Sequence, residues 1–118
     1  MPELTIYHNP RCSTSRHAVG AVAVTGGEAD VVQYLRTPLD REQLLELLGK
    51  LEDPPADLVR KDAHFAELGL SATDYTTPEQ VADLLAEHPR LMQRPVLVRG
   101  DRAIIGRPKS RADEFVAG

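Results

Sequence analysis

The hydrophobic and polar positions of this chain follow two different spacings, which together predict an ordered series of strands and helices. Short runs rich in β-branched and aromatic residues predict strands at residues 3–7 and 29–34. The segment between them, residues 13–25, has helical character and ends at Gly26, because glycine is the usual residue just past a helix end. A strand–helix–strand unit of this kind predicts a parallel pair of strands with a right-handed crossover.

A broad leucine stripe marks the start of a second region, residues 40–88, which we interpret as a helical insert. Asp40 and Gln43 have the spacing of a capping box and predict a helix that runs to about residue 49. Thr77 followed by Pro78 predicts another helix start, because proline is favoured at the first helical position. The insert is therefore predicted to hold four helical segments. They lie at residues 40–49, at 53 to about 61, around 65–68 with an end near 69, and at 77–88.

The chain returns to strand spacing after a predicted loop at residues 91–95. Strands are predicted at 96–99 and 102–105, on either side of a Gly–Asp pair typical of hairpin turns, and a last helix at 109–116. The resulting α/β order is a βαβ unit, a helical insert, a β-hairpin and a C-terminal helix, which is the order of a thioredoxin-like mixed sheet. A length of 118 residues fits one domain, residues 1–118.

Composition narrows the class of protein. The net charge of −4 argues against a dedicated nucleic-acid surface, and no apolar run approaches the roughly 20 residues of a membrane span. A single cysteine excludes an intrachain disulfide and indicates a reducing compartment. The four histidines are scattered and lack the spacing of metal ligands. We therefore expect a cytoplasmic monomer with no metal, membrane or nucleic-acid partner.

The cysteine lies between the first predicted strand and the first predicted helix. Cys12 follows a loop fixed by Pro10 and precedes Ser13, a residue type that suits a helix start. Unpaired N–H groups at a helix start favour both a thiolate and a bound oxyanion, and Arg11 and Arg16 add positive charge. The segment is thus a candidate low-pKa cysteine beside a candidate anion site. The alternative is a buried core residue, the commonest role of a lone cysteine in a small domain.

Cys12 has no resolving cysteine within the chain. Position 15, where a dithiol motif would carry its second cysteine, is a serine. An oxidised Cys12 must therefore be resolved by a thiol from another molecule.

Seven segments in order and at matching spacing give the chain a resemblance to a known family over nearly its whole length. The chain resembles the glutaredoxin-dependent arsenate reductases. Its loop Arg11-Cys12-Ser13 is more similar to that of the shorter chromosomal members, and the chain stops at Gly118, whereas plasmid-encoded members often carry a longer C-terminal tail. The matching segments are residues 6–16, 34–38, 58–61, 67–70, 87–89, 93–96 and 105–108.

The resemblance implies a thioredoxin-like fold and the reduction of arsenate, or a similar oxyanion, to arsenite. It implies that Cys12 is the catalytic cysteine and forms a thiol–arsenate adduct. Three arginines would bind the oxyanion, at positions matched here by Arg60, Arg94 and Arg107. Glutathione is implied as co-substrate and glutaredoxin as partner, with no bound cofactor. The alternative for each arginine is a solvated surface side chain.

Three further residues take roles from the resemblance. His8 would lower the pKa of Cys12, Ser15 would place a hydroxyl near the thiolate, and Pro95 would be a cis proline facing the cysteine loop. His8 could instead be a surface loop histidine. Ser15 could equally be a helix cap.

Two other functions compete with arsenate reduction. One is a glutathione-linked thiol reductase acting on glutathionylated proteins, which deglutathionylation without arsenate turnover would support. The other is a non-catalytic regulator of the same fold that binds RNA polymerase and senses oxidation through a Cys-x-x-Cys pair. The chain lacks that pair, which argues against the regulator.

Overall fold

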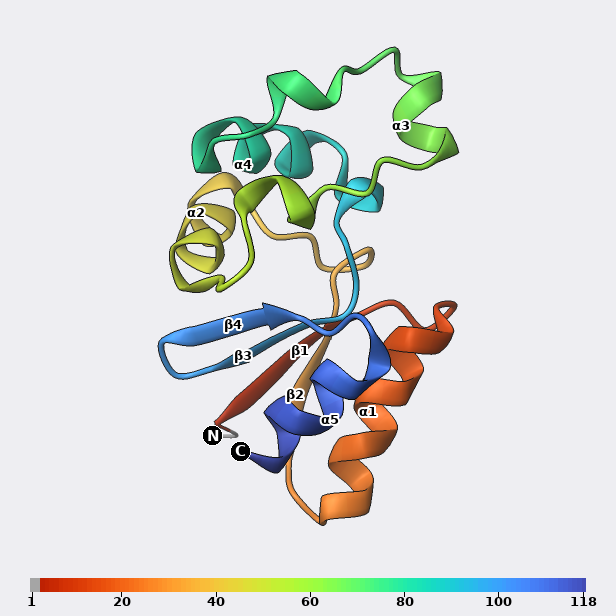
Figure 1. The fold of residues 1–118 in the computed structure, drawn as a ribbon, viewed down its shortest axis with the longest axis vertical. Coiled ribbons are helices and arrows are strands. Elements are labelled where there is room, and N and C mark those ends of the chain that lie inside the picture. The colour runs from red at the N-terminus through yellow and green to blue at the C-terminus, as the bar shows by residue number, and fades with distance from the viewer. Residues whose placement is uncertain (1–2) are drawn as a thin grey trace.

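A computed structural model describes residues 3–118, and its centre is a four-stranded mixed sheet with strands in the order β2-β1-β3-β4 (Figure 1). The strands are β1 (Leu4–His8), β2 (Ala29–Gln33), β3 (Val96–Arg99) and β4 (Arg102–Ile105). The helices are α1 (Ser13–Thr25), α2 (Arg41–Lys50), α3 (Ala63–Glu67), α4 (Pro78–Glu87) and α5 (Lys109–Ala117). The predicted α/β architecture is confirmed, and these strands and α-helices follow one another in the predicted order.

Strands β1 and β2 are parallel, as the βαβ pattern predicts. Their register runs from Leu4 opposite Ala29 to His8 opposite Gln33. Strand β3 is antiparallel to β1, and β4 is antiparallel to β3. Because β1 and β2 end side by side, the loops that follow His8 and Gln33 emerge at the same edge of the sheet.

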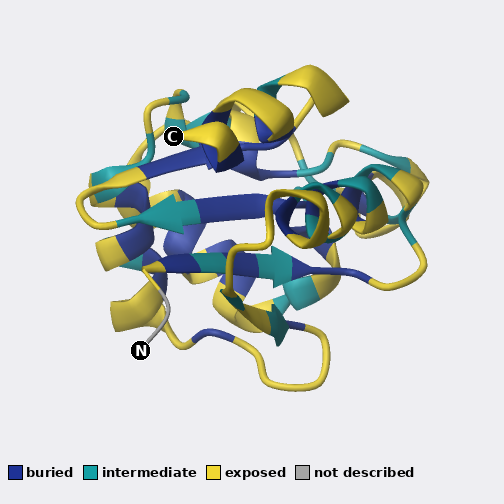
Figure 2. Ribbon diagram, turned by 90° about the horizontal axis from the view of Figure 1, so that it is seen from below, coloured by how far each residue is buried: buried dark blue, intermediate teal, exposed yellow. Residues whose placement is uncertain are grey.

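The two faces of the sheet are covered by different helices (Figures 1 and 2). Helices α1 and α5 cover one face, and their apolar side chains pack with Ile6 and Leu97. The helical insert covers the other face, where Val96 and Ala103 join a larger cluster with the leucines of α2 and α4. Neighbouring positions such as Val96 and Leu97 belong to opposite clusters because side chains alternate across a strand.

Two predicted helix starts have the expected caps. At the start of α2, the Asp40 carboxylate accepts from the Gln43 N–H at 2.9 Å, and the Asp40 N–H donates to the Gln43 side chain at 2.9 Å. Thr77 and Gln80 form the same reciprocal pair before α4. Both capping boxes therefore hold the insert's two longest helices at their N-termini.

One predicted helix is wrong. The segment expected to be helical to about residue 61 is only a 3₁₀ turn, Pro55–Leu58. Val59 is extended instead and forms an antiparallel bridge with Met92. The Arg60 N–H also donates to the Leu91 carbonyl oxygen at 2.6 Å. Pairing with this distant segment outweighs the local helical tendency and holds the Arg60 backbone beside Leu91.

Smaller differences lie at element ends. Strand β1 runs one residue further than predicted, and β2 ends one residue earlier. Two 3₁₀ turns, Ala72–Asp74 and Pro89–Leu91, were not predicted. Within residues 3–118, no helix has the length and apolar character needed to cross a membrane.

Candidate active site

The Cys12 loop connects the end of β1 to the start of α1. Cys12 is the N-cap residue of α1 and has an extended backbone, with φ −102° and ψ 122°. Its N–H donates to the Asn9 carbonyl oxygen at 3.0 Å, and its carbonyl accepts from the Arg16 N–H at 2.9 Å. The predicted position at a helix start is confirmed. The side chain is partly exposed, unlike the fully buried core cysteine that was the alternative.

The surroundings of Cys12 lower its pKa. Burial by itself raises the pKa of the thiol, but four donors outweigh it: the Ser15 N–H, the Arg94 side chain, the Thr14 N–H and the Arg107 side chain. Together they bring the pKa of Cys12 to about 7. Cys12 is therefore thiolate at neutral pH to a much larger extent than an ordinary thiol, which is only a few per cent ionised.

Arg107 approaches Cys12 from the loop between β4 and α5. Its Nη1 lies 3.7 Å from the Cys12 sulfur and donates to the Arg94 carbonyl oxygen at 3.1 Å. The peptide bonds after both arginines are cis, at Arg94–Pro95 and Arg107–Pro108. The cis proline implied at position 95 is thus confirmed, and the one at 108 was not predicted.

Gly106 allows these two proline segments to come together. Its N–H donates to the Pro95 carbonyl oxygen at 2.9 Å. A Cβ at this position would lie 2.7 Å from Leu97 Cδ1 and 2.9 Å from Pro95 Cγ. Only glycine fits this close approach, which sets the position of Arg107.

Arg94 carries a donor with no partner. Its Nε is buried and makes no hydrogen bond within residues 3–118. The Oε1 of the neighbouring Gln93 is also buried and accepts no hydrogen bond from these residues. An unpaired buried donor costs on the order of 1–3 kcal/mol. An oxyanion beside Cys12 would give the Arg94 Nε–H an acceptor.

Unlike the other two predicted arginines, Arg60 is not among the groups that donate to the Cys12 thiol within residues 3–118. Its Nε donates to the Asp62 carboxylate at 3.2 Å. With Arg107 and Gln93 it lines a small pocket of about 210 Å³. The structure therefore brings Arg94 and Arg107 to Cys12 directly, whereas Arg60 reaches the same region beside Arg107 and is partly neutralised by Asp62.

His8 and Ser15 form a buried pair behind the cysteine loop. His8 Nδ1 and the Ser15 hydroxyl oxygen are 2.6 Å apart, and the same hydroxyl accepts from the Asn9 N–H at 3.0 Å. Burial, with the Arg16 charge as a second cause, lowers the pKa of His8. His8 is therefore neutral at pH 7, and any effect on Cys12 passes through hydrogen bonds rather than through its charge.

The side chain of Ser15 does not cap α1. No side-chain cap hydrogen bond is present at the start of this helix. Ser15 is fully buried, and its hydroxyl is used by His8 and Asn9, while its backbone N–H faces the thiol. The Ser15 hydroxyl thus stabilises the loop, and the Ser15 backbone N–H is one of the donors that lower the pKa of Cys12.

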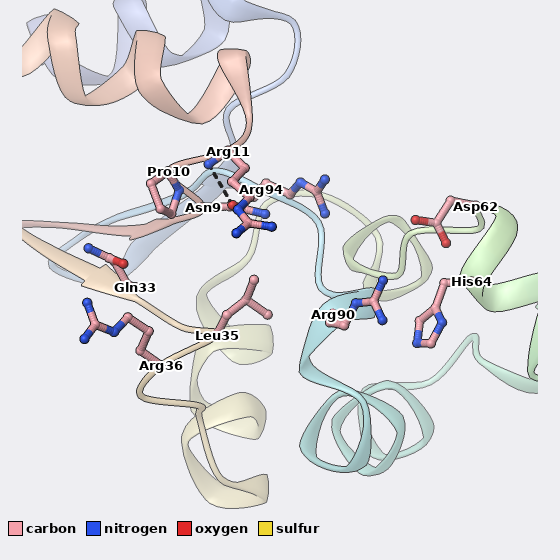
Figure 3. A pocket seen from close by; sticks show the side chains of 10 residues that line it. All are labelled: Asn9, Pro10, Arg11, Gln33, Leu35, Arg36, Asp62, His64, Arg90 and Arg94. Atoms are coloured by element: carbon pink, nitrogen blue, oxygen red, sulfur yellow. Dashed lines mark hydrogen bonds between the residues drawn. The ribbon is translucent and has the colours of Figure 1, made fainter.

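A larger cavity of about 530 Å³ opens beside the cysteine loop (Figure 3). In Figure 3 the segment after β2, with Leu35 and Arg36, lies on one side, and Arg90 and His64 from the helical insert lie on the other. The lining residues are Asn9, Pro10, Arg11, Gln33, Leu35, Arg36, Asp62, His64, Arg90 and Arg94. Four of these ten are arginines, so the cavity is strongly cationic.

The sequence interpretation did not assign Arg36 or Arg90 to a site. Arg36 could have been found, because residues that follow neighbouring parallel strands meet at the carboxyl edge of a sheet, where ligands bind in open α/β folds. Arg90 carried no such signal, since only the folded insert places it opposite Arg36. Among the described residues, no cluster of three or more histidine, cysteine, aspartate or glutamate side chains could hold a metal ion.

Comparisons with known proteins agree on one family. The sequence model of the ArsC family matches residues 7–115. An arsenate reductase of Neisseria meningitidis is 39% identical over 110 residues, which cover 92% of this chain and 93% of the relative. YfgD of Escherichia coli K12, an uncharacterized protein, is 39% identical over 116 residues and 97% of each chain.

Solved structures give the same result. The structure of an arsenate reductase from Vibrio cholerae superimposes with a TM-score of 0.83 at 32% identity, covering 94% of this chain and 95% of that one. This likeness confirms the predicted thioredoxin-like fold class.

Proposed function

The chain belongs to the ArsC family, and from this premise we propose that it reduces arsenate to arsenite through a covalent Cys12 adduct. Glutathione and glutaredoxin are the proposed external reductants. The observation that carries the proposal is the convergence of Arg94 and Arg107 on a Cys12 thiol whose pKa is about 7. Relatives of this family are named arsenate reductases in N. meningitidis and V. cholerae.

Arsenate is a tetrahedral anion at neutral pH, and guanidinium groups are its natural protein ligands. Each guanidinium offers parallel N–H donors that match a pair of oxyanion oxygens. Arg94 and Arg107 would hold the anion at the sulfur, and Arg60 would contribute from the adjoining pocket. The backbone N–H groups at the start of α1 would add further donors.

The first chemical step forms the adduct. The Cys12 thiolate attacks arsenic, an S–As bond forms, and one As–O bond breaks. The departing oxygen takes up protons and leaves as water. A lowered pKa favours this step, because the thiolate is the nucleophile. His8 would act as a positioning residue through Ser15, which fixes the loop that presents the thiolate.

The later steps need thiols from outside, because the chain has no second cysteine. A glutathione thiol displaces another oxygen of the adduct as water and forms a second S–As bond. A glutaredoxin thiolate then attacks the glutathione sulfur, forming a mixed disulfide. The electron pair of the broken S–As bond stays on arsenic, which becomes As(III). Water finally displaces the Cys12 thiolate and releases arsenite.

A coupled assay tests this function. NADPH oxidation would be followed with arsenate, glutathione, glutaredoxin and glutathione reductase, for the native chain and for Cys12→Ser. The proposal predicts turnover that depends on arsenate and on both reductants and is lost in the variant. Phosphate in place of arsenate serves as the control for a non-reducible oxyanion. Absence of turnover from a folded, reduced native chain would overturn the proposal and direct attention to glutathionylated proteins as substrates.

A further inference from the structure

The cavity of about 530 Å³ adjoins the cysteine loop, because Asn9, Pro10 and Arg11 of that loop line it. We propose that it binds the reductant, a small thiol with a carboxylate at each end, of which glutathione is the natural probe. This inference rests on the proposed function and adds to it the place and the residues that select the thiol. The residues proposed to hold the two carboxylates are Arg36 and Arg90.

The cavity carries unsatisfied positive charge. The lining contains five residues of the types arginine, lysine, aspartate and glutamate. Four of them are arginines and one is Asp62. Asp62 already accepts from Arg60 and from the Phe65 N–H. Within the part of the chain that the structure describes, Arg36 and Arg90 form no ion pair with a carboxylate. Such a concentration of free guanidinium groups favours an anionic ligand.

The positions of Arg36 and Arg90 suit a ligand with two separated charges. Arg36 extends from the loop after β2, Arg90 from the turn after α4, and Leu35 lies between them in Figure 3. Two cations on opposite sides of the cavity match a ligand whose two carboxylates are well separated. Leu35 is 42% exposed and offers apolar surface for the methylene groups between the ligand's ends. The volume of about 530 Å³ is in the usual range for small-molecule sites.

Arg94 connects the cavity to Cys12. Arg94 lines the cavity and is also one of the donors that lower the pKa of the Cys12 thiol. Arg107 is not among the cavity's lining residues and approaches the sulfur from the loop before α5. The arrangement therefore gives the oxyanion and the reductant thiol separate approaches to the same sulfur, with Arg94 at their junction.

A binding experiment tests the inference without relying on turnover. S-methylglutathione, which cannot react, would be titrated into the native chain and followed by isothermal calorimetry. Binding is expected, and Arg36→Gln and Arg90→Gln should each weaken it roughly tenfold, the effect of losing one charge-assisted hydrogen bond at an open site. Lys50→Gln, which removes one positive charge at the end of α2 outside the cavity lining, is the matched control and should leave the affinity unchanged.

Ligand variants sharpen the test. S-methylglutathione with its glycine carboxylate converted to an amide lacks one of the two charges. If one arginine holds that carboxylate, substituting it should cost the amide ligand little, while substituting the other arginine should still weaken binding. No binding of S-methylglutathione, or equal losses from Lys50→Gln, would overturn the cavity assignment and leave arsenate reduction itself untouched. Absence of arsenate turnover with intact ligand binding would instead reject the proposed function.

Discussion

The Arg107 Nη1 lies 3.7 Å from the Cys12 sulfur, although 95 residues separate the two in sequence. The same nitrogen donates to the Arg94 carbonyl oxygen at 3.1 Å. One guanidinium therefore links the cysteine loop to the two proline segments. This link makes the charge beside the thiol a property of the whole fold rather than of the cysteine loop alone.

The lowered pKa of Cys12 predicts that its thiolate forms at a lower pH than that of an ordinary thiol. As pH rises, the ultraviolet thiolate absorbance should increase around a midpoint of about 7 in the native chain. Arg107→Gln should move that midpoint upward, toward the ordinary thiol value, because the variant removes one of the donors to the sulfur. Cys12→Ser supplies the blank. An unshifted midpoint in the Arg107 variant would show that the guanidinium has no influence on the thiol.

The same shift has a consequence for stability. Because the pKa of Cys12 is lower in the folded chain than in the unfolded one, ionisation favours the fold. That contribution is complete above the unfolded thiol's pKa of about 8.5 and is lost as pH falls through about 7. As pH rises between these values, the free energy of unfolding in urea should therefore increase for the native chain relative to Cys12→Ser. A constant difference across this range would contradict the shift.

The three arginines should not be equivalent. Arg94→Ala and Arg107→Ala should each lower arsenate-dependent kcat/KM. The expected loss of transition-state stabilisation is about 1.5–3 kcal/mol, the typical cost of a lost charged hydrogen bond. Arg60→Ala should cost less, because Asp62 already engages its guanidinium. Steady-state kinetics of the three variants measures the order.

Arg41→Ala is the control for that series. Arg41 pairs with Asp83 between α2 and α4 and lies outside both pockets described above. Its substitution should leave kcat/KM near the native value. Equal losses from all four variants would show that net charge, rather than a specific site, governs the reaction.

Ser15 is predicted to support the loop from within. Ser15→Ala leaves the Asn9 N–H and His8 Nδ1 without their partner in a buried place, which should lower the free energy of unfolding by about 1–3 kcal/mol. Urea denaturation measures that loss. Ser13→Ala is the matched control, because Ser13 is exposed and its hydroxyl makes no hydrogen bond in the described part of the chain. Equal stability of the two variants would remove Ser15 from this role.

Gly106 should be intolerant of any side chain. Gly106→Ala places a methyl group against Leu97 and Pro95, and overpacking of this kind typically costs about 1–3 kcal/mol. Thermal and urea unfolding report the loss, and arsenate kinetics should fall as well because the Arg107 segment moves. Gly20→Ala, in the interior of α1 with open space around it, should instead stabilise the chain by about 0.5–1 kcal/mol. Similar effects at the two glycines would contradict the packing argument.

Local signals in the sequence account for much of the fold. The spacing of Asp40 and Gln43 predicts a cap that the structure contains, and the Gly100 turn joins β3 to β4 as expected. These elements depend on interactions between residues close in sequence. Val59 was predicted wrongly because its bridge to Met92 is a distant contact that no local pattern encodes.

The site was predictable to a similar extent. The thiol's position at a helix start follows from the residues around Cys12, and its partners were implied by family resemblance. The resemblance did not indicate how unequal those partners are, since Arg60 is engaged by Asp62 and His8 is neutral. Arg90 had no signal at all, because its place opposite Arg36 is created by the folding of the insert.

The central claim is that Cys12, Arg94 and Arg107 form one oxyanion site, and protection of Cys12 tests it most directly. The rate of Cys12 alkylation by iodoacetamide, a neutral reagent, would be measured at pH 7 with increasing arsenate at constant ionic strength. The account predicts a saturable decrease in rate, which Arg107→Gln shifts to higher arsenate concentration. A rate unaffected by arsenate, with Cys12 still reactive, would contradict the account.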